Sequence, residues 1–414
     1  MPKQTKKTGT LLGFVDIPID DKEQPTIEDT FIGGQPLWFD PKSPPPKKLL
    51  LCKNCESPMK LLLQSYCPLS DSIYDRIIYV FACSKAGCRR KQGSVRAIRS
   101  VKRDPEAMKK LEIEIKTEEY NKKQAEEEAE KETLKTKDLS KNIFAAGSKS
   151  GSNPFDSNPF AASEKKSANP FDYLKKNDVE NNGELNNKAT KIEAKDYKSL
   201  IPRKDSLQKP NGSLDISLAS FPGSFLYIED EVLDPSKSPE TQIPSNFSPE
   251  QLSEQGASAS PSDDLGQSKE LEEIAKAVDD PTFRHFTEIV SYNSSQVFRY
   301  DFGGSPLLYN TKDSISKIFC DQKGHLLDSS NFRIPTPSFH PSGSRIFEFQ
   351  IMPQAIDALE SDGTIDILKD GMEWGTIIVG TDSEDYTPDS FFDQNYIAYV
   401  EEWCGVQWEE EVKI

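Results

Sequence analysis

Four cysteines in two short pairs constrain the fold of this chain more than any other feature. The pairs are Cys52-x-x-Cys55 and Cys83-x-x-x-x-Cys88. Two such pairs are typical of one structural zinc site, because Zn²⁺ takes four tetrahedral ligands and a short turn supplies two thiolates at once. All four positions are then filled, so we expect this zinc to stabilise the fold and to take no part in catalysis. Two disulfides, or four unrelated buried thiols, are the alternative interpretation.

Apolar segments lead into both cysteine pairs. Leu49–Leu51 precedes Cys52, and Ile77–Phe81 precedes Cys83. Two strands that each end in a thiol-bearing turn form a zinc-ribbon arrangement. We therefore predict a zinc-ribbon-like knuckle in the first ordered region of the chain.

Composition divides the chain into ordered and unordered stretches. Only 35% of its 414 residues are hydrophobic, which predicts that a sizeable fraction is disordered. We assign residues 1–103 to an N-terminal zinc-binding, β-rich lobe and residues 221–414 to a C-terminal acidic, β-rich lobe. Between them, residues 104–220 are predicted to form a charged helix and a disordered linker. A second disordered insertion is expected at about residues 235–267.

The two ordered regions share a repeated order of segments. Gly33–Leu37 (GGQPL) matches Gly303–Leu307 (GGSPL). Two strand-like matches follow in the same order: Leu61–Gln64 with Phe347–Gln350, and Ile77–Val80 with Thr376–Val379. We therefore predict an α+β, β-rich fold of two related lobes, produced by internal duplication and split by the long disordered insertion.

Charge is distributed unevenly along the chain, whose formal net charge is −17. Residues 1–103 contain 18 Lys and Arg against 10 Asp and Glu, whereas residues 357–414 contain 2 Lys against 16 Asp and Glu. This asymmetry predicts a basic partner for the acidic end. A merely solvated acidic stretch is the alternative.

Aromatic residues interrupt the acidic stretch, which indicates that it is folded and displays its carboxylates. We predict that it captures a basic client, with aromatic anchors that supply affinity and carboxylates that speed association. The candidate client-binding residues are Phe392, Tyr396, Glu401, Glu402, Trp403, Trp408, Glu409 and Glu410. Burial of both tryptophans in the core of their own lobe is the alternative.

Several longer segments of the two ordered regions resemble one known family. These are Leu12–Asp16, Phe31–Trp38, Cys52–Met59, Leu61–Tyr66, Ile78–Cys83, Arg345–Pro353 and Glu373–Ile377. The chain is similar to the programmed-cell-death-protein-two family, and within it to the fungal branch of 20S-rRNA-accumulation proteins. Many members of that family carry a Cys-x-x-Cys just before the strand equivalent to Phe347–Gln350, and this chain does not. A second zinc site is therefore not expected here.

The resemblance implies a function. Members of this family act as dedicated chaperones of a newly made small-subunit ribosomal protein, the eukaryotic S-two. Such a chaperone is needed for assembly of the 40S subunit and for processing of 20S pre-rRNA, and it can associate transiently with ribosomes or pre-ribosomes. A ribosomal protein is strongly basic, so an acidic folded surface could screen it until rRNA displaces the chaperone.

Two other functions remain as alternatives. The segment Lys85–Arg103 holds eight basic residues and no acidic one beside the predicted knuckle, which is compatible with direct RNA binding. Three Asn-Pro-Phe tripeptides, which begin at Asn153, Asn158 and Asn169, could dock endocytic adaptor domains. Low-complexity drift is the favoured explanation of the same tripeptides.

Neither catalysis nor membrane insertion is indicated. The chain has three histidines, none in a recognisable catalytic or metal motif, so we predict that it is not an enzyme. No apolar run approaches the length of a membrane span, and the first residues lack a signal-peptide pattern. We expect a location in the cytoplasm, with the nucleus as a further compartment, and no membrane partner.

Overall fold

The computed structural model describes residues 6–145, 206–234, 280–363 and 369–409, except positions 70, 71, 73, 213 and 370. The chain divides into two compact units. The first comprises Met1–Met108 together with Pro202–Ile414, and the second comprises Lys109–Ile201. The three Asn-Pro-Phe tripeptides and the insertion expected at residues 235–267 lie outside the described residues. Among the helices that the structure describes, none combines the length and the apolar character needed to cross a membrane.

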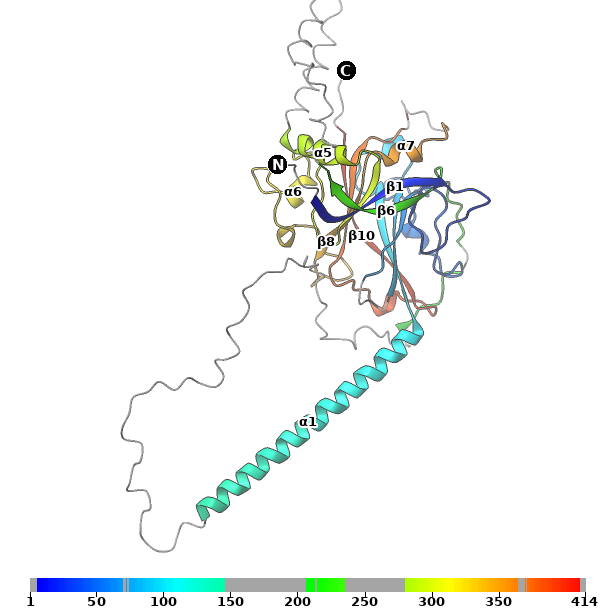
Figure 1. Ribbon diagram of the computed structural model, residues 1–414. Coiled ribbons are helices and arrows are strands. Elements are labelled where there is room, and N and C mark those ends of the chain that lie inside the picture. Colours follow the sequence, from blue (N-terminus) through cyan, green and yellow to red (C-terminus); the bar gives the residue numbers. More distant parts are fainter. Residues whose placement is uncertain are drawn as a thin grey trace, which may run out of the picture. The chain divides into compact units, whose positions relative to one another are not determined.

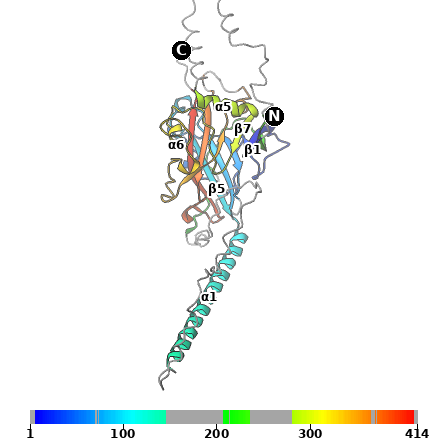
Figure 2. The ribbon, with the colours of Figure 1, turned by 60° about the vertical axis from the view of Figure 1, so that its left-hand side comes forward.

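The first unit is built on one closed, antiparallel β-barrel of ten strands. In sequence order they are β1 (Lys6–Pro18), β2 (Phe31–Ile32), β3 (Lys60–Tyr66), β4 (Tyr74–Ala82), β5 (Val95–Arg103), β6 (Ser224–Leu233), β7 (Gln296–Tyr300), β8 (Arg345–Ile351), β9 (Trp374–Asp382) and β10 (Ile397–Trp408). Around the barrel they follow the order β1-β6-β2-β3-β4-β5-β10-β9-β8-β7. Figures 1 and 2 show the blue-to-cyan strands of the first half closing against the yellow-to-red strands of the second.

Among the described residues of the first unit, the named helices are α5 (Pro281–Tyr292), α6 (Ser316–Phe319) and α7 (Ala355–Leu359), with short 3₁₀ turns at Lys47–Leu49, Ala86–Cys88, Ser329–Asn331 and Asp389–Phe391. The helix α1 (Pro105–Ala145) begins where the sequence places its start signal, since the Asp104 side chain accepts a hydrogen bond from the Glu106 amide at 2.8 Å. Its exposed, charged surface is consistent with a helix that has no continuous apolar face.

The prediction of an α+β fold with two separate lobes is wrong. Strand β5 of the first half pairs with β10 of the second, and β1 pairs with β7. Strand β6, which follows the long insertion, pairs with both β1 and β2. The sequence repeat identifies similar strands but carries no information about which edges meet. Two half-sheets have open edges, and pairing them with each other satisfies the backbone groups of both.

The repeated segments occupy comparable places within the single barrel. β3 and β8 have the same length, and each has a register irregularity against its next strand, between Leu61 and Leu63 and between Phe347 and Phe349. The Gln64 side-chain oxygen accepts a hydrogen bond from the Leu37 amide at 2.9 Å. The matching oxygen of Gln350 accepts one from the Leu307 amide at 2.7 Å. Each buried glutamine thereby holds the segment after its Gly-Gly turn.

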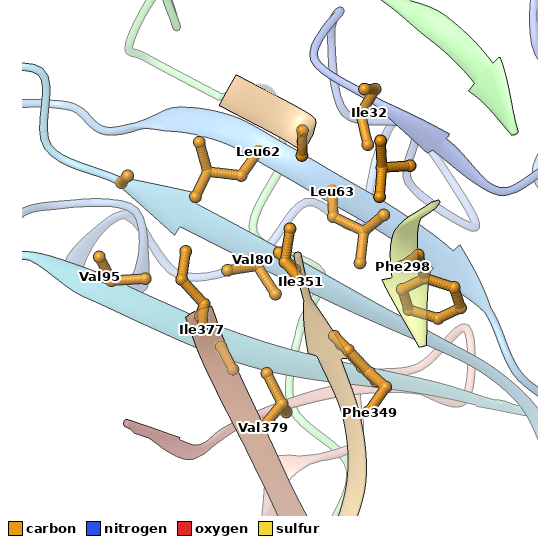
Figure 3. Close-up of a cluster of buried hydrophobic side chains, with 14 of the residues drawn as sticks. Ile32, Leu62, Leu63, Val80, Val95, Phe298, Phe349, Ile351, Ile377 and Val379 are labelled. Carbon is orange, nitrogen blue, oxygen red and sulfur yellow. The ribbon is translucent and has the colours of Figure 1, made fainter. Parts of the chain in front are cut away.

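Apolar side chains from both halves fill part of the barrel interior. The cluster combines strands β3 to β5 with β7 to β9, and Leu63, Val80, Phe298, Phe349 and Ile377 belong to it. Figure 3 shows these side chains pointing toward one another from strands far apart in the sequence. Because each half contributes only part of this buried apolar surface, neither half has a complete core of its own.

The rest of the interior is ionic. By strand alternation Arg76 lies on the same face as Ile78, and Arg99 on the same face as Ala97. The Arg76 guanidinium forms a bidentate ion pair with Glu348, and its Nε donates to Asp385 Oδ1 at 2.8 Å.

The ionic chain continues across the β5–β10 pairing. Arg99 donates to Asp385 at 2.7 Å and to Glu402 at 2.8 Å, and Glu402 also accepts from Arg345 at 2.9 Å. Neighbouring carboxylates raise the pKa of Arg76 and of Arg99 against the opposing effect of burial, so both stay charged. Three arginines and three carboxylates alternate, so the buried charge is compensated within the network. The two arginines of the first half thereby bind carboxylates of the second.

Replacing Arg99 with Met tests this network. The Arg99→Met variant leaves Asp385 and Glu402 each without one cationic partner in a buried site, so we expect the free energy of unfolding in urea to fall by about 3–5 kcal/mol. The exposed Arg333 offers a matched control, and Arg333→Met should change the same quantity by no more than about 0.5 kcal/mol. Equal, small effects of the two substitutions would contradict a stabilising network.

Candidate metal centre and the adjacent groove

The four predicted cysteines come together. Their sulfur atoms all lie within 4.8 Å of one another, and the Sγ atoms of Cys55 and Cys83 are 3.7 Å apart. Four thiolates around Zn²⁺, with Zn–S bonds of about 2.3 Å, have S–S separations of about 3.8 Å in a regular tetrahedron. The cluster therefore fits a four-coordinate metal with little adjustment.

Tight turns place the sulfur atoms. In the first turn the Glu56 amide donates to the Cys52 carbonyl, and Glu56 takes a left-handed conformation with φ of 54°. The Asn54 amide donates to Cys52 Sγ at 3.4 Å and so helps to orient this sulfur within the turn. The second pair follows the end of β4, with Cys83 directly after it and Cys88 in a 3₁₀ turn.

The thiols differ in how readily they ionise. Hydrogen bonds from the backbone and hydroxyl of Ser57 lower the pKa of Cys55 to about 6. Desolvation raises the pKa of Cys83 to about 12. A cation among the four sulfur atoms would offset that desolvation and let all four bind as thiolates.

The knuckle is packed against the barrel. Cys52 and Cys88 are buried in an outer apolar cluster with Leu50, Met59 and Phe81. Leu218, from the chain that returns to the barrel after the long insertion, is buried in the same cluster. A metal here would hold these outer segments against β3 and β4, which is a structural role.

A groove of about 740 Å³ lies beside the knuckle. Leu51 and Lys53 of the knuckle line one part of it, Tyr399 and Glu401 of β10 another, and Phe391 lies on the loop before β10. Phe339 and the returning segment around Gln208 also contribute. No sequence pattern indicated this groove, because its walls come from five separate stretches, one of them Arg96 of β5.

Glu401 links the groove to the knuckle. Its carboxylate pairs with Arg96 at 2.9 Å and with Lys53 at 2.8 Å. Partial burial opposes its ionisation, but hydrogen bonds and charge from these two cations lower the pKa of Glu401 overall. Arg96 also donates to the carbonyls of Lys48 and Leu51, so this ion pair joins β5, β10 and the segment that leads to Cys52.

The residues predicted to bind a client are dispersed. Glu402 belongs to the buried ionic network and its side chain is 0% exposed. Phe392 is buried, and the Arg103 guanidinium carbon lies 3.9 Å from the centroid of the Phe392 ring. Tyr396 forms the bend before β10 with φ of 59°, and its carbonyl accepts from the Arg103 amide.

The remaining client-binding candidates lie further along β10. Trp403 packs edge-on against Phe319 with 5.9 Å between ring centroids, and Trp408 is half-buried against the barrel core. Glu409 is exposed, and Glu410 lies outside the described residues.

Most of the basic run Lys85–Arg103 is engaged within the barrel. Five of its eight basic residues form ion pairs with carboxylates of the second half. These arginines are Arg89, Arg90, Arg96, Arg99 and Arg103. The run is thus an internal counterpart of the acidic stretch, and few of its cations face outward for phosphate contacts.

Two family models match the chain. The Programmed cell death protein 2 N-terminal domain matches residues 9–110, and the C-terminal domain of the same protein matches residues 280–408. The chain belongs to the Programmed cell death protein 2 family. The two matched ranges hold most strands of the barrel and all four clustered cysteines.

Relatives of this family are similar along most of the chain. "Probable 20S rRNA accumulation protein 4" of Schizosaccharomyces pombe is 28% identical over 440 residues, covering 99% of this chain and 100% of the relative. "Programmed cell death protein 2-like" proteins of Mus musculus and Homo sapiens are each 24% identical, covering 86% of this chain and 84% of each relative. No solved structure matches the chain.

The pH dependence of stability tests the Glu401 contacts. Because the folded-state pKa of Glu401 is lowered, its contribution is present above its unfolded pKa of about 4.3 and is lost as the pH falls through the folded value. Urea unfolding should therefore show Glu401→Gln to be less stable than the unmodified chain at pH 7, with the difference shrinking below pH of about 4.3. The exposed Glu384, changed to Gln, should give no such trend. A pH-independent difference for Glu401→Gln would contradict these contacts.

Proposed function

We propose that this protein is a dedicated chaperone of a newly made, basic small-subunit ribosomal protein, the eukaryotic S-two. In this role it supports assembly of the 40S subunit and processing of 20S pre-rRNA. The observation that carries the proposal is the alignment along 99% of the chain with a relative named for 20S rRNA accumulation. A chaperone that meets its client during or soon after translation acts in the cytoplasm, and transient contact with pre-ribosomes follows from handing the client over.

The charge of the protein supports this role. A formal net charge of −17 attracts a basic client and repels RNA. Since many carboxylates of the second half are engaged with arginines inside the barrel, the surface that meets the client has to be formed by other, exposed residues. We assign no catalytic reaction to the protein, and its described regions serve in this proposal as a rigid binding scaffold.

We further propose that the four clustered cysteines bind one structural zinc. The distances and the all-thiolate donor set support this identity, because sulfur ligands in a tetrahedral arrangement favour Zn²⁺. When bound, the metal supplies folding free energy, on the order of 10 kcal/mol in small zinc domains. Ser57 donates hydrogen bonds to the Cys55 sulfur and Asn54 donates one to the Cys52 sulfur, and these contacts help to hold the two ligands in place.

Metal analysis of the purified chain tests the zinc proposal. We expect about one zinc per chain, and loss of that zinc in a Cys55→Ser/Cys83→Ser variant together with a lower melting temperature. Cys320 is buried away from the cluster, so a Cys320→Ser variant should keep its zinc and serves as the control. A folded, untagged protein prepared without chelators that contains no zinc would contradict the proposal.

Depletion and affinity purification test the chaperone role. Removing the protein from cells should raise the level of 20S pre-rRNA relative to mature small-subunit rRNA and lower the soluble amount of protein S-two. Purification of the full chain at mild salt should enrich newly synthesised S-two above other small-subunit proteins. Normal processing after depletion, or enrichment of all small-subunit proteins alike, would contradict a dedicated chaperone.

A further inference from the structure

Exposed apolar side chains gather on two paired strands of the barrel. Val15 and Ile17 of β1 are 37% and 40% exposed, and Tyr227 and Ile228 of β6 are 43% and 41% exposed. These four are more than half of the large exposed hydrophobic residues that the structure describes in the barrel unit. Large apolar side chains gathered on one part of a surface are typical of an interaction site.

Pairing places these side chains on the two faces of one pair of strands, with Val15 and Ile228 on one face and Tyr227 on the other. β1 and β6 lie side by side in Figure 1, with Phe14 opposite Tyr227 and Gly13 opposite Ile228. The Tyr227 ring stacks on Phe14 with 5.1 Å between centroids, so it is held in place without being covered. Gly13 leaves room for Ile228, whose Cδ1 would be only 3.2 Å from a Cβ atom at that position. The side chains are therefore fixed in position by β1 while remaining exposed.

Exposed carboxylates lie in the same segments as the apolar residues. In β1, β6 and the loop that follows β1, the exposed acidic residues are Asp16, Asp20, Asp21, Glu23, Glu28, Glu229 and Asp230. Among the described side chains of the same segments, the exposed basic ones are Lys7 and Lys22. Lys7 pairs with Asp230 at 3.0 Å, and both are largely exposed, so this contact is weak. Unlike the carboxylates of the ionic network, most of these face solvent.

One edge of β1 leaves backbone groups as well as side chains available to a partner. β1 pairs with β7 only over Leu11–Phe14, while its pairing with β6 extends to Pro18. The described register therefore leaves Val15–Pro18 paired on the β6 side alone. An extended peptide could lie along this stretch and use its backbone groups, as in recognition by strand addition.

We infer that this β1–β6 surface, formed by the four exposed apolar residues on the two faces of the paired strands and by the seven carboxylates above, binds an extended, Lys- and Arg-rich segment that also carries apolar side chains. The apolar residues supply the affinity and the carboxylates speed association and select a cationic sequence. The inference rests on the proposed chaperone function for the identity of the client, because such segments are typical of ribosomal proteins outside the ribosome. The surface itself is assigned from the exposed side chains and their charge.

Two variants of the full chain test the surface. In the first, Val15, Ile17 and Ile228 are each changed to Thr, which keeps the β-branched shape that strands favour and removes apolar area. In the second, Asp16→Lys is combined with Glu229→Lys. The matched controls are Leu326→Thr, at an exposed apolar residue outside these strands, and Glu384→Lys combined with Asp357→Lys. Circular dichroism and thermal melting confirm that each variant is folded.

Two binding measurements are made on every variant. The first is retention of purified protein S-two. The second is fluorescence anisotropy with a synthetic peptide in which lysines alternate with valines and leucines, with a glutamate-for-lysine peptide as the negative probe. We expect the threonine variant to bind both cationic partners about tenfold or more weakly, through faster dissociation. The lysine variant should associate more slowly, most clearly at low salt. Both controls should behave as the unmodified chain.

The outcomes separate the surface from the function. If the unmodified chain retains S-two and both folded surface variants retain it equally well, the β1–β6 assignment is overturned while the chaperone proposal stands. If the unmodified chain does not retain S-two but binds the cationic peptide through these residues, the chaperone proposal fails and the surface stands. Equal binding of the lysine and glutamate peptides would overturn the charge selection and with it the inferred partner.

Discussion

The ion pairs that Arg76 and Arg99 make with Glu348, Asp385 and Glu402 determine how the two halves of this protein can fold. A guanidinium in the barrel interior is tolerated only when carboxylates compensate its charge and satisfy its donors. Here the first half of the sequence supplies the two cations and the second half supplies all three anions. Either half alone would bury uncompensated charge, so the network favours the shared barrel over two independent lobes.

The same interactions change the meaning of the charge pattern. A basic beginning and an acidic end suggested an external basic partner for the acidic stretch, yet Glu401, Glu402 and Asp385 each bind a cation of the first half. A net charge counted along the sequence cannot distinguish a carboxylate that faces solvent from one that faces an arginine. Part of the negative charge that remains exposed lies elsewhere, along β1 and β6.

The cysteine cluster could be predicted because its geometry is local. Two ligands within one turn are close in any fold. The strand predicted at Leu49–Leu51 is wrong, because Leu49 ends a 3₁₀ turn and Leu51 forms only an isolated bridge. The second predicted strand is β4, and it pairs with β3, which follows the first cysteine pair. The repeated Gly-Gly turns and the order of the strand-like segments after them could also be read from the sequence. Gln64 and Gln350, one in each repeat, accept equivalent backbone hydrogen bonds. The closed barrel was not predictable, because pairing of β5 with β10 depends on contacts between residues about three hundred positions apart. For the same reason, no local sequence pattern indicated that Phe392 and Glu402 are buried.

The same ten strands support a cysteine knuckle, a mixed apolar and ionic interior and an exposed acidic surface. The most direct test is to produce residues 1–145 and 202–414 as separate polypeptides and to follow each, and their mixture, by thermal melting. If the barrel is shared, neither polypeptide alone shows a cooperative transition, and the mixture, refolded with zinc, shows one transition together with 1:1 association. Cooperative melting of each polypeptide by itself, unchanged on mixing, would contradict the account.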